Sequence, residues 1–156
     1  MTHALNLTLP LKQDDATKAA LRQLEATFET HVQPAIDAAL KKSQLVHFAR
    51  VLVIDDKYIQ VITEYEGDHQ EYTEFFRKEL TPVFAAIFSL AEGAPEANET
   101  NAFWLYSKSR NIRSLGKHTH GGLDFSGNPA GWLFSAYDHK SVREIQHALG
   151  LDPGEG

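Results

Sequence analysis

The residues best suited to chemistry lie in a basic segment of an acidic chain. The 156 residues carry a formal net charge of -6, yet residues 100–123 contain no Asp or Glu. Guanidinium groups form paired hydrogen bonds with carboxylates and phosphates, and nearby glycines let backbone N–H groups approach an anion. The segment therefore predicts a site for a small, anionic organic ligand. Its proposed ligand-binding side chains are Arg110, Arg113, Lys117, His118 and His120. The alternative is a solvated basic loop.

The two histidines of this segment raise the question of a metal. His118 and His120 are two residues apart, so both side chains point the same way if the chain is extended, and Asp124 or Glu64 is the candidate third ligand. A histidine pair without a fixed third ligand is a weak pattern, and the HEXXH arrangement of zinc proteases is absent. No metal and no cofactor are therefore predicted.

A second group of polar side chains lies on one predicted strand face. His47 shares it with Tyr58, Gln60 and Glu64. Because an imidazole titrates near neutral pH, His47 is the predicted catalytic proton donor or acceptor, with Glu64 among the ligand-binding residues. The alternative is that these groups form hydrogen bonds across a subunit interface. Arg50, expected inside the sheet, requires a carboxylate partner there.

Composition excludes several classes of function. The chain has no cysteine, which excludes disulfides, iron–sulfur clusters and thiol nucleophiles. No Gly-x-Ser-x-Gly elbow or glycine-rich phosphate loop is present. The acidic balance argues against nucleic acid as a partner, and the lack of a long apolar run argues against a membrane. Without a secretory signal, a cytoplasmic location is expected.

The first half of the chain has the clearest elements. Leucines alternate with polar residues over 5–11, which predicts a strand, and Pro10 places it at an edge or near its end. An apolar stripe over 21–40 predicts a helix capped by Asp14 or Asp15. Pro34 either kinks this helix or lies in the first turn of a second one.

A β-hairpin follows. Two β-rich runs, 45–54 and 58–65, flank Asp55-Asp56-Lys57. With a two- or four-residue loop, odd positions of one strand share a face with even positions of the other. Both faces are then largely apolar. Helices are expected to cover one face, and a second copy of the chain the other.

The second half is harder to interpret. Asp68 caps a helix that Pro82 kinks and Gly93 ends, and short strands are predicted at 102–106 and 132–138. A long loop at 107–131 lies between them. Asp138 caps a short last helix, and the tail at 151–156 is frayed. The order predicts a single α+β domain over residues 1–156: ferredoxin-like βαββαβ with an antiparallel sheet and an extra C-terminal helix.

Residues 46–74, VHFARVLVIDDKYIQVITEYEGDHQEYTE, resemble the dimeric α+β barrel superfamily, and in particular the N-terminal half of dye-decolourising-type peroxidase relatives. The resemblance implies a homodimer whose sheets pack face to face, with a pocket between sheet and helices or inside the barrel. Those peroxidases carry a Gly-x-x-Asp-Gly motif, and here Phe125 replaces its last glycine.

Three functions are therefore weighed. The first is a homodimeric α+β barrel that binds a small ligand, as a cofactor-free oxidoreductase or isomerase if it is an enzyme. The second is a haem-binding, peroxidase-like protein. The third is a structural or interaction module without a small-molecule site. The first rests on fold analogy.

Overall fold

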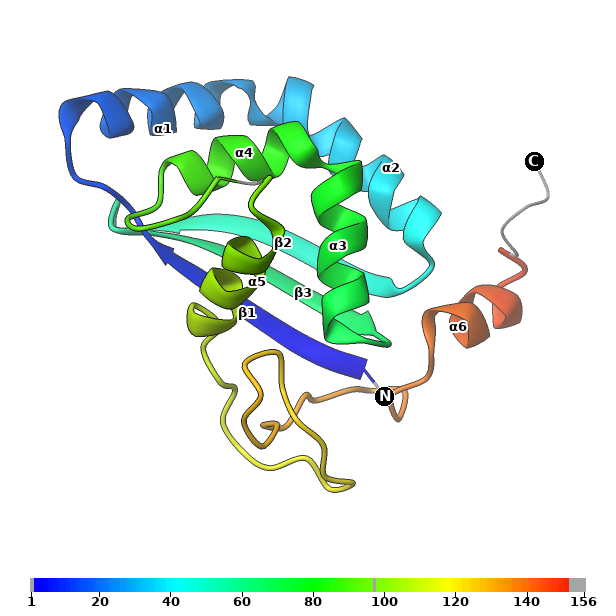
Figure 1. Ribbon diagram of the computed structural model, residues 1–156. Coiled ribbons are helices and arrows are strands. Elements are labelled where there is room, and N and C mark those ends of the chain that lie inside the picture. The colour runs from blue at the N-terminus through cyan, green and yellow to red at the C-terminus, as the bar shows by residue number, and fades with distance from the viewer. Residues whose placement is uncertain (1, 97, 152–156) are drawn as a thin grey trace.

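The computed structural model describes residues 2–96 and 98–151 and shows an α+β chain built on a three-stranded antiparallel sheet (Figure 1). The strands are β1 (Thr2–Pro10), β2 (Val46–Ile54) and β3 (Tyr58–Glu66). Their order in the sheet is β1-β3-β2, so β3 separates the first two. The predicted first strand and the hairpin are confirmed, and Pro10 ends β1.

The hairpin turn corrects the predicted strand faces. Ile54 pairs directly with Tyr58, so the loop has three residues, and both Asp55 and Asp56 adopt left-handed backbone angles (φ 53°). Aspartate tolerates this conformation better than most residues. With an odd loop length, even positions of β2 share a face with even positions of β3, contrary to the prediction.

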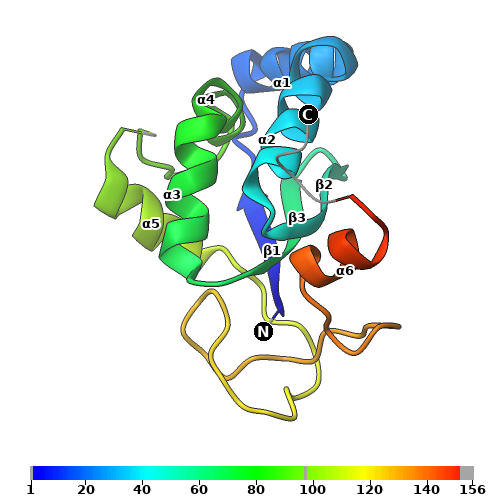
Figure 2. The same cartoon turned by 90° about the vertical axis from the view of Figure 1, so that its right-hand side faces the viewer.

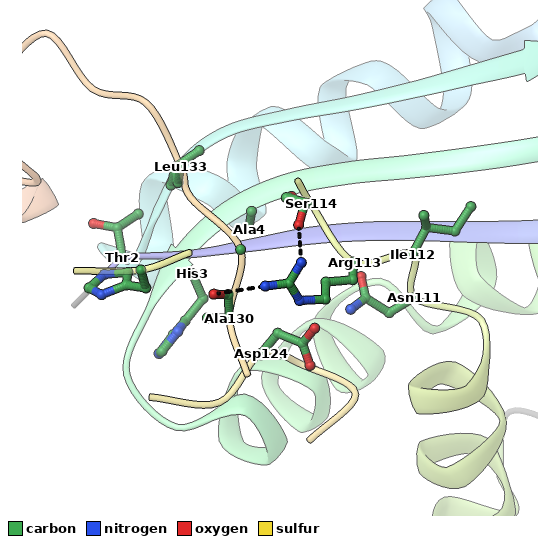
Figure 3. A pocket seen from close by; sticks show the side chains of 12 residues that line it. Thr2, His3, Ala4, Asn111, Ile112, Arg113, Ser114, Asp124, Ala130 and Leu133 are labelled. Carbon is green, nitrogen blue, oxygen red and sulfur yellow. Dashed lines mark hydrogen bonds between the residues drawn. The ribbon is translucent and has the colours of Figure 1, made fainter. Parts of the chain in front are cut away.

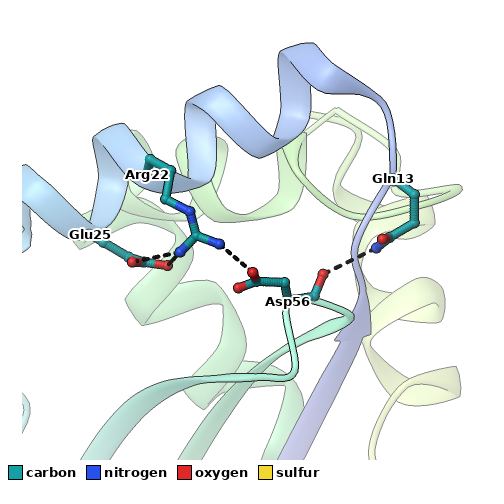
Figure 4. A network of polar contacts seen from close by, with 4 residues as sticks. All are labelled: Gln13, Arg22, Glu25 and Asp56. Atoms are coloured by element: carbon teal, nitrogen blue, oxygen red, sulfur yellow. Dashed lines mark hydrogen bonds and ion pairs between the residues drawn. The ribbon is translucent and has the colours of Figure 1, made fainter.

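Figure 4 shows how the same turn is tied to the first helix. Arg22 donates hydrogen bonds to Glu25 and to the carboxylate of Asp56, and Gln13 Nε2 donates to the Asp56 carbonyl at 3.1 Å. Arg22 and Asp56 are both about half exposed, so these ion pairs contribute little stability. Their effect is to fix the orientation of the turn.

Four helices pack on one face of the sheet: α1 (Asp15–Thr27), α2 (Gln33–Ser43), α3 (His69–Glu79) and α4 (Thr81–Ser89). A π-helical turn, η1 (Phe28–Val32), joins the first two. Proline lacks an N–H, and α2 accommodates Pro34 in its first turn, which confirms the second alternative. Asp14 caps α1 and Asp68 caps α3, as predicted.

The core lies between these helices and the sheet. Alternate leucines of β1 point into it, and Leu9 is fully buried. Tyr65 stacks on Tyr72 with 3.9 Å between ring centroids, and Phe88 of α4 lies 4.5 Å from Phe103. Burial of each large side chain contributes about 1.5–3 kcal/mol. The sheet is thus held firmly against α3 and α4.

The opposite face of the sheet is largely open. Figure 2 shows the helices α1 to α4 gathered on one side, with only the short helix α6 (Val142–Ala148) near the other. Phe48 is 72% exposed on this face, and Ile54 and Tyr58 are also exposed. The sheet therefore presents apolar side chains that its own helices do not cover.

Several predicted elements in the second half are wrong. Helix α3 ends at Glu79 before Pro82, so there are two helices and not one kinked helix. Residues 102–106 belong to helix α5 (Thr100–Ser109), because Phe103 and Ser107 form one buried helical face. Residues 132–138 form no regular strand, and Ser141, not Asp138, caps the last helix. The frayed-tail prediction falls almost wholly on 152–156, outside the described residues.

Three residues, 110 to 112, lie beside β1, where a fourth strand would pair with it. Asn111 bridges Leu7, Thr8 N donates to the Arg110 carbonyl at 2.8 Å, and Ile112 N donates to the Asn6 carbonyl at 3.0 Å. The predicted loop thus begins against the edge of the sheet. A complete ferredoxin-like arrangement is not confirmed. Within 2–96 and 98–151, no helix is both long and apolar enough to cross a membrane.

Candidate functional site

The basic segment folds back on itself through Arg113. Its guanidinium donates to the carbonyls of Pro129 at 2.6 Å, Ser114 at 3.1 Å and Gly116 at 2.7 Å. Figure 3 shows the bond to Ser114 and a longer one, of 3.5 Å, to the Ala130 carbonyl. Gly131 permits this close approach, because a Cβ there would lie 2.0 Å from the Ser114 carbonyl oxygen. Arg113, predicted to bind a ligand, therefore uses its donors to join the two arms of the segment.

A small cavity lies between this segment and the start of β1. Its volume is about 20 Å³, enough for a single water molecule. Four side chains that line it are His3, Arg113, His118 and Asp124. Two of the predicted ligand-binding residues, Arg113 and His118, thus meet here, but the space does not admit an organic ligand.

Asp124 organises the turn that closes the cavity. Its Oδ1 accepts hydrogen bonds from the backbone N–H of Ser126 at 2.9 Å and of Asn128 at 3.0 Å. Oδ2 is buried and has no hydrogen-bond partner among the described residues. One water in the cavity would satisfy it. The aspartate of the Gly-Gly-Leu-Asp-Phe sequence is therefore accounted for by loop structure.

A tyrosine and a histidine anchor the segment to the core. The Tyr65 hydroxyl contacts His69 Nδ1, and His69 Nε2 lies 3.1 Å from the Leu123 carbonyl. A carbonyl can only accept, so Nε2 carries the proton and Nδ1 accepts from Tyr65. Burial raises the pKa of Tyr65, which keeps the hydroxyl protonated as this network requires. No local pattern in the sequence indicated this pair.

His3 stands against His69 at a ring-centroid distance of 4.2 Å. Burial, and to a smaller extent the neighbouring His69, lowers the pKa of His3 from 6.5 to about 4. Between pH 4 and pH 6.5, His3 is therefore mostly protonated in the unfolded chain and mostly neutral in the folded chain. The contribution of His3 to the free energy of unfolding is fully present above pH 6.5 and is lost as the pH falls toward 4.

This difference predicts a measurable pH dependence. Between pH 7 and pH 4.5 the free energy of unfolding, measured with urea, should fall by about 2 kcal/mol through His3. A His3→Asn variant should lose that part of the dependence, whereas His31→Asn, at an exposed histidine, should keep it. Identical pH profiles for the wild type and the His3 variant would contradict this assignment.

The two histidines of the predicted pair have different surroundings. His118 is buried, its Nδ1 accepts from the His120 N–H at 3.1 Å, and its ring lies 6.1 Å from that of His139. Burial first, and then these two neighbours, lowers the pKa of His118. Throughout the described part of the chain, no group of three His, Asp or Glu residues is arranged to hold a metal ion.

The remaining predicted residues are dispersed. Arg110 lies over the Tyr106 ring at 5.2 Å, while Lys117 and His120 are exposed. His47 sits at a β-bulge with Nε2 2.8 Å from Glu66 Oε1, which also accepts the Val142 N–H at 2.5 Å. Through Glu66, His47 thus helps to hold the first residue of α6 in place.

Glu64 and Arg50 share the open face of the sheet. Burial raises the pKa of Glu64, and the charge of nearby Arg50 opposes that shift. Arg50 is exposed in the single chain, so its predicted burial depends on a second copy of the chain and stays a prediction. The two side chains place opposite charges on one surface, and they belong to β2 and β3 and not to the basic segment.

The resemblance implied a pocket between sheet and helices or inside the barrel, but no residue pattern in the sequence identified the lining of the larger pocket. This pocket measures about 50 Å³ and lies between the sheet and helices α2, α3 and α4. The residues that line it include Ile36, Ala49, Val51, Val61, Phe84 and Ile87. The polar residues of the lining are Thr63 and Tyr72, and their hydroxyl oxygens lie 2.7 Å apart. The apolar stripes that form this pocket looked like ordinary core in the sequence.

Comparison of the chain with protein-family models, with curated proteins and with solved structures found no match.

Proposed function

We propose that the protein binds a small apolar organic molecule in the pocket between its sheet and helices α2 to α4. The observation that carries this proposal is the apolar lining with one hydroxyl pair, Thr63 and Tyr72, in it. Ligand pockets are commonly apolar, with a few polar groups that orient the ligand.

The volume and the lining define the class of ligand. About 50 Å³ corresponds to a few water molecules, whereas a cavity that encloses a whole benzene ring measures about 150 Å³. The pocket would therefore enclose about three or four non-hydrogen atoms of a ligand, and the rest of a ring such as that of phenol would extend between the half-buried side chains of Ile36, Leu40 and Phe84. A hydroxyl group of the ligand could donate a hydrogen bond to the Tyr72 oxygen, which still has a free acceptor site. Burial raises the pKa of Tyr72, so its hydroxyl stays neutral. A charged group buried there would find no partner of opposite charge in the lining.

The proposal includes a homodimer formed through the open face of the sheet. Phe48, Ile54 and Tyr58 would be buried between two sheets, a common packing arrangement. A two-fold axis places the same surface on both sides, so Arg50 of each copy could meet Glu64 of the other. Opposite charges on one face make that surface complementary to itself.

Calorimetric titration with phenol, benzene and benzoate tests the ligand class. Phenol should bind saturably with one site per chain, and benzene about fivefold more weakly because it lacks a hydroxyl. Benzoate has a similar size but a buried carboxylate would be unpaired, so no binding is expected. Preference for benzoate would favour the basic segment instead, and would contradict the apolar pocket.

A further inference from the structure

The irregular segment between α5 and α6 combines positive charge with exposed apolar side chains. Residues 110–141 contain four Lys or Arg and two Asp, a formal charge of +2, while the rest of the chain carries -8. Leu115 is 89% exposed and Phe134 85% exposed. Ile112, Leu123 and Tyr137 are exposed as well. Exposed apolar groups of this size commonly mark a binding surface.

The most exposed of these side chains belong to one part of the fold. The Trp132 N–H donates to the Leu115 carbonyl at 3.0 Å, and the His118 N–H donates to the Ala130 carbonyl at 3.1 Å. The rings of Trp132 and Phe134 are 6.5 Å apart. Leu115, Lys117, Trp132 and Phe134 therefore lie on two neighbouring arms, which Arg113 joins. We call these four residues the basic–apolar tip.

We propose that the basic–apolar tip docks on the surface of an anionic lipid membrane. Leu115 and Phe134 would enter the boundary between headgroups and acyl chains, and Lys117 would lie among the phosphate and carboxylate groups, supported by Lys140. In Figure 1 the segment extends below the sheet, away from α1, α2 and α4. The tip can thus reach a flat surface while those helices stay clear of it.

Two observations favour a membrane over a protein partner. Side chains exposed to 85–89% protrude from the molecule with little packed around them, which suits insertion into a fluid layer more than docking in a rigid groove. The segment that carries the tip also has a positive formal charge, whereas the rest of the chain has a negative one. Because exposed charges are screened over about 10 Å at 0.1 M salt, the net charge of -6 does not prevent contact at the tip.

Neither a spanning helix nor a basic net charge is needed for such docking. The sequence argument against a membrane considered the length of apolar runs, which bears on spanning segments alone. The proposal is independent of the ligand pocket and of the dimer, because none of its residues lines that pocket or lies on the open sheet face. Its failure would leave both of those proposals standing.

Flotation with lipid vesicles tests the proposal. The full chain should float with vesicles of phosphatidylcholine containing 30% phosphatidylserine, and at least tenfold less with pure phosphatidylcholine. Raising the salt from 0.1 to 0.5 M should release it. The double variant Leu115→Ala, Phe134→Ala should bind at least tenfold more weakly, and Lys117→Glu several-fold more weakly. Lys41→Glu, at an exposed lysine of α2, should bind as the wild type does.

The variants remain interpretable because their side chains are highly exposed, so the thermal midpoint should not change. Absence of flotation with phosphatidylserine vesicles at 0.1 M salt would overturn the proposal. Equal flotation of the wild type and the double variant would overturn it too. Binding of a soluble Glu-rich peptide without any binding to vesicles would assign the surface to a protein partner.

Discussion

Phe48→Asp is expected to convert the protein from a dimer to a monomer. Phe48 is 72% exposed in the single chain, so the substitution should leave the fold intact. In a two-fold interface each dimer carries the change twice and buries two unpaired carboxylates. The dimer dissociation constant should rise by at least about 100-fold. Analytical ultracentrifugation measures it directly.

A charge exchange on the same face gives an independent check. Arg50→Glu should weaken the dimer, and adding Glu64→Arg should restore it, if each arginine meets the partner's glutamate. Leu105→Asp, at an exposed leucine of α5, serves as the matched control for Phe48→Asp. A wild-type chain that sediments at 17.5 kDa at high concentration would contradict the dimer.

Ala49→Phe is expected to abolish phenol binding. Ala49 lies on β2 beside Thr63, and both line the pocket of about 50 Å³. The added ring would occupy the volume that the ligand needs. Because the ring adds more volume than the pocket offers, part of it overpacks the core, and the free energy of unfolding should fall by about 1–3 kcal/mol.

The matched control places the same change outside the pocket. Ala85→Phe, on the exposed side of α4, should bind phenol as the wild type does. Loss of binding in both variants would point to a global effect. Undiminished binding in Ala49→Phe would show that phenol binds elsewhere.

The elements of the first half were predictable because their signals are local. Alternate leucines define β1, and Asp14 and Asp68 lie immediately before the helices they cap. The hairpin was equally clear, but its faces were not. They depend on whether the loop has an odd or even number of residues, and the sequence left that open.

The second half depends on contacts between distant residues. The aromatic run at 102–106 has the composition of a strand, yet packing of Phe103 against Phe88 places it in a helix. The path of residues 111–141 depends on hydrogen bonds such as those from Arg113 to Pro129 and from His69 to Leu123. No local pattern encodes such pairs.

The candidate sites show the same division. The basic segment was identified by its composition, and Arg113 was assigned to a ligand because a guanidinium that binds carbonyls looks the same in sequence as one that binds anions. No residue pattern identified the lining of the apolar pocket, because imperfect packing between helices and sheet is a three-dimensional property. In the sequence, Ala49 and Val61 would look the same if they lay in a fully packed core.

Methyl-labelled NMR titration with phenol tests the central claim most directly. The methyl signals of Ile36, Val51, Val61 and Ile87, all in the pocket lining, should shift together and saturate at one ligand per chain. The signals of Leu115 and Leu123, which lie outside it, should stay unchanged. Shifts confined to those two leucines, or an absence of saturable shifts in the pocket, would contradict a ligand site between the sheet and helices α2 to α4.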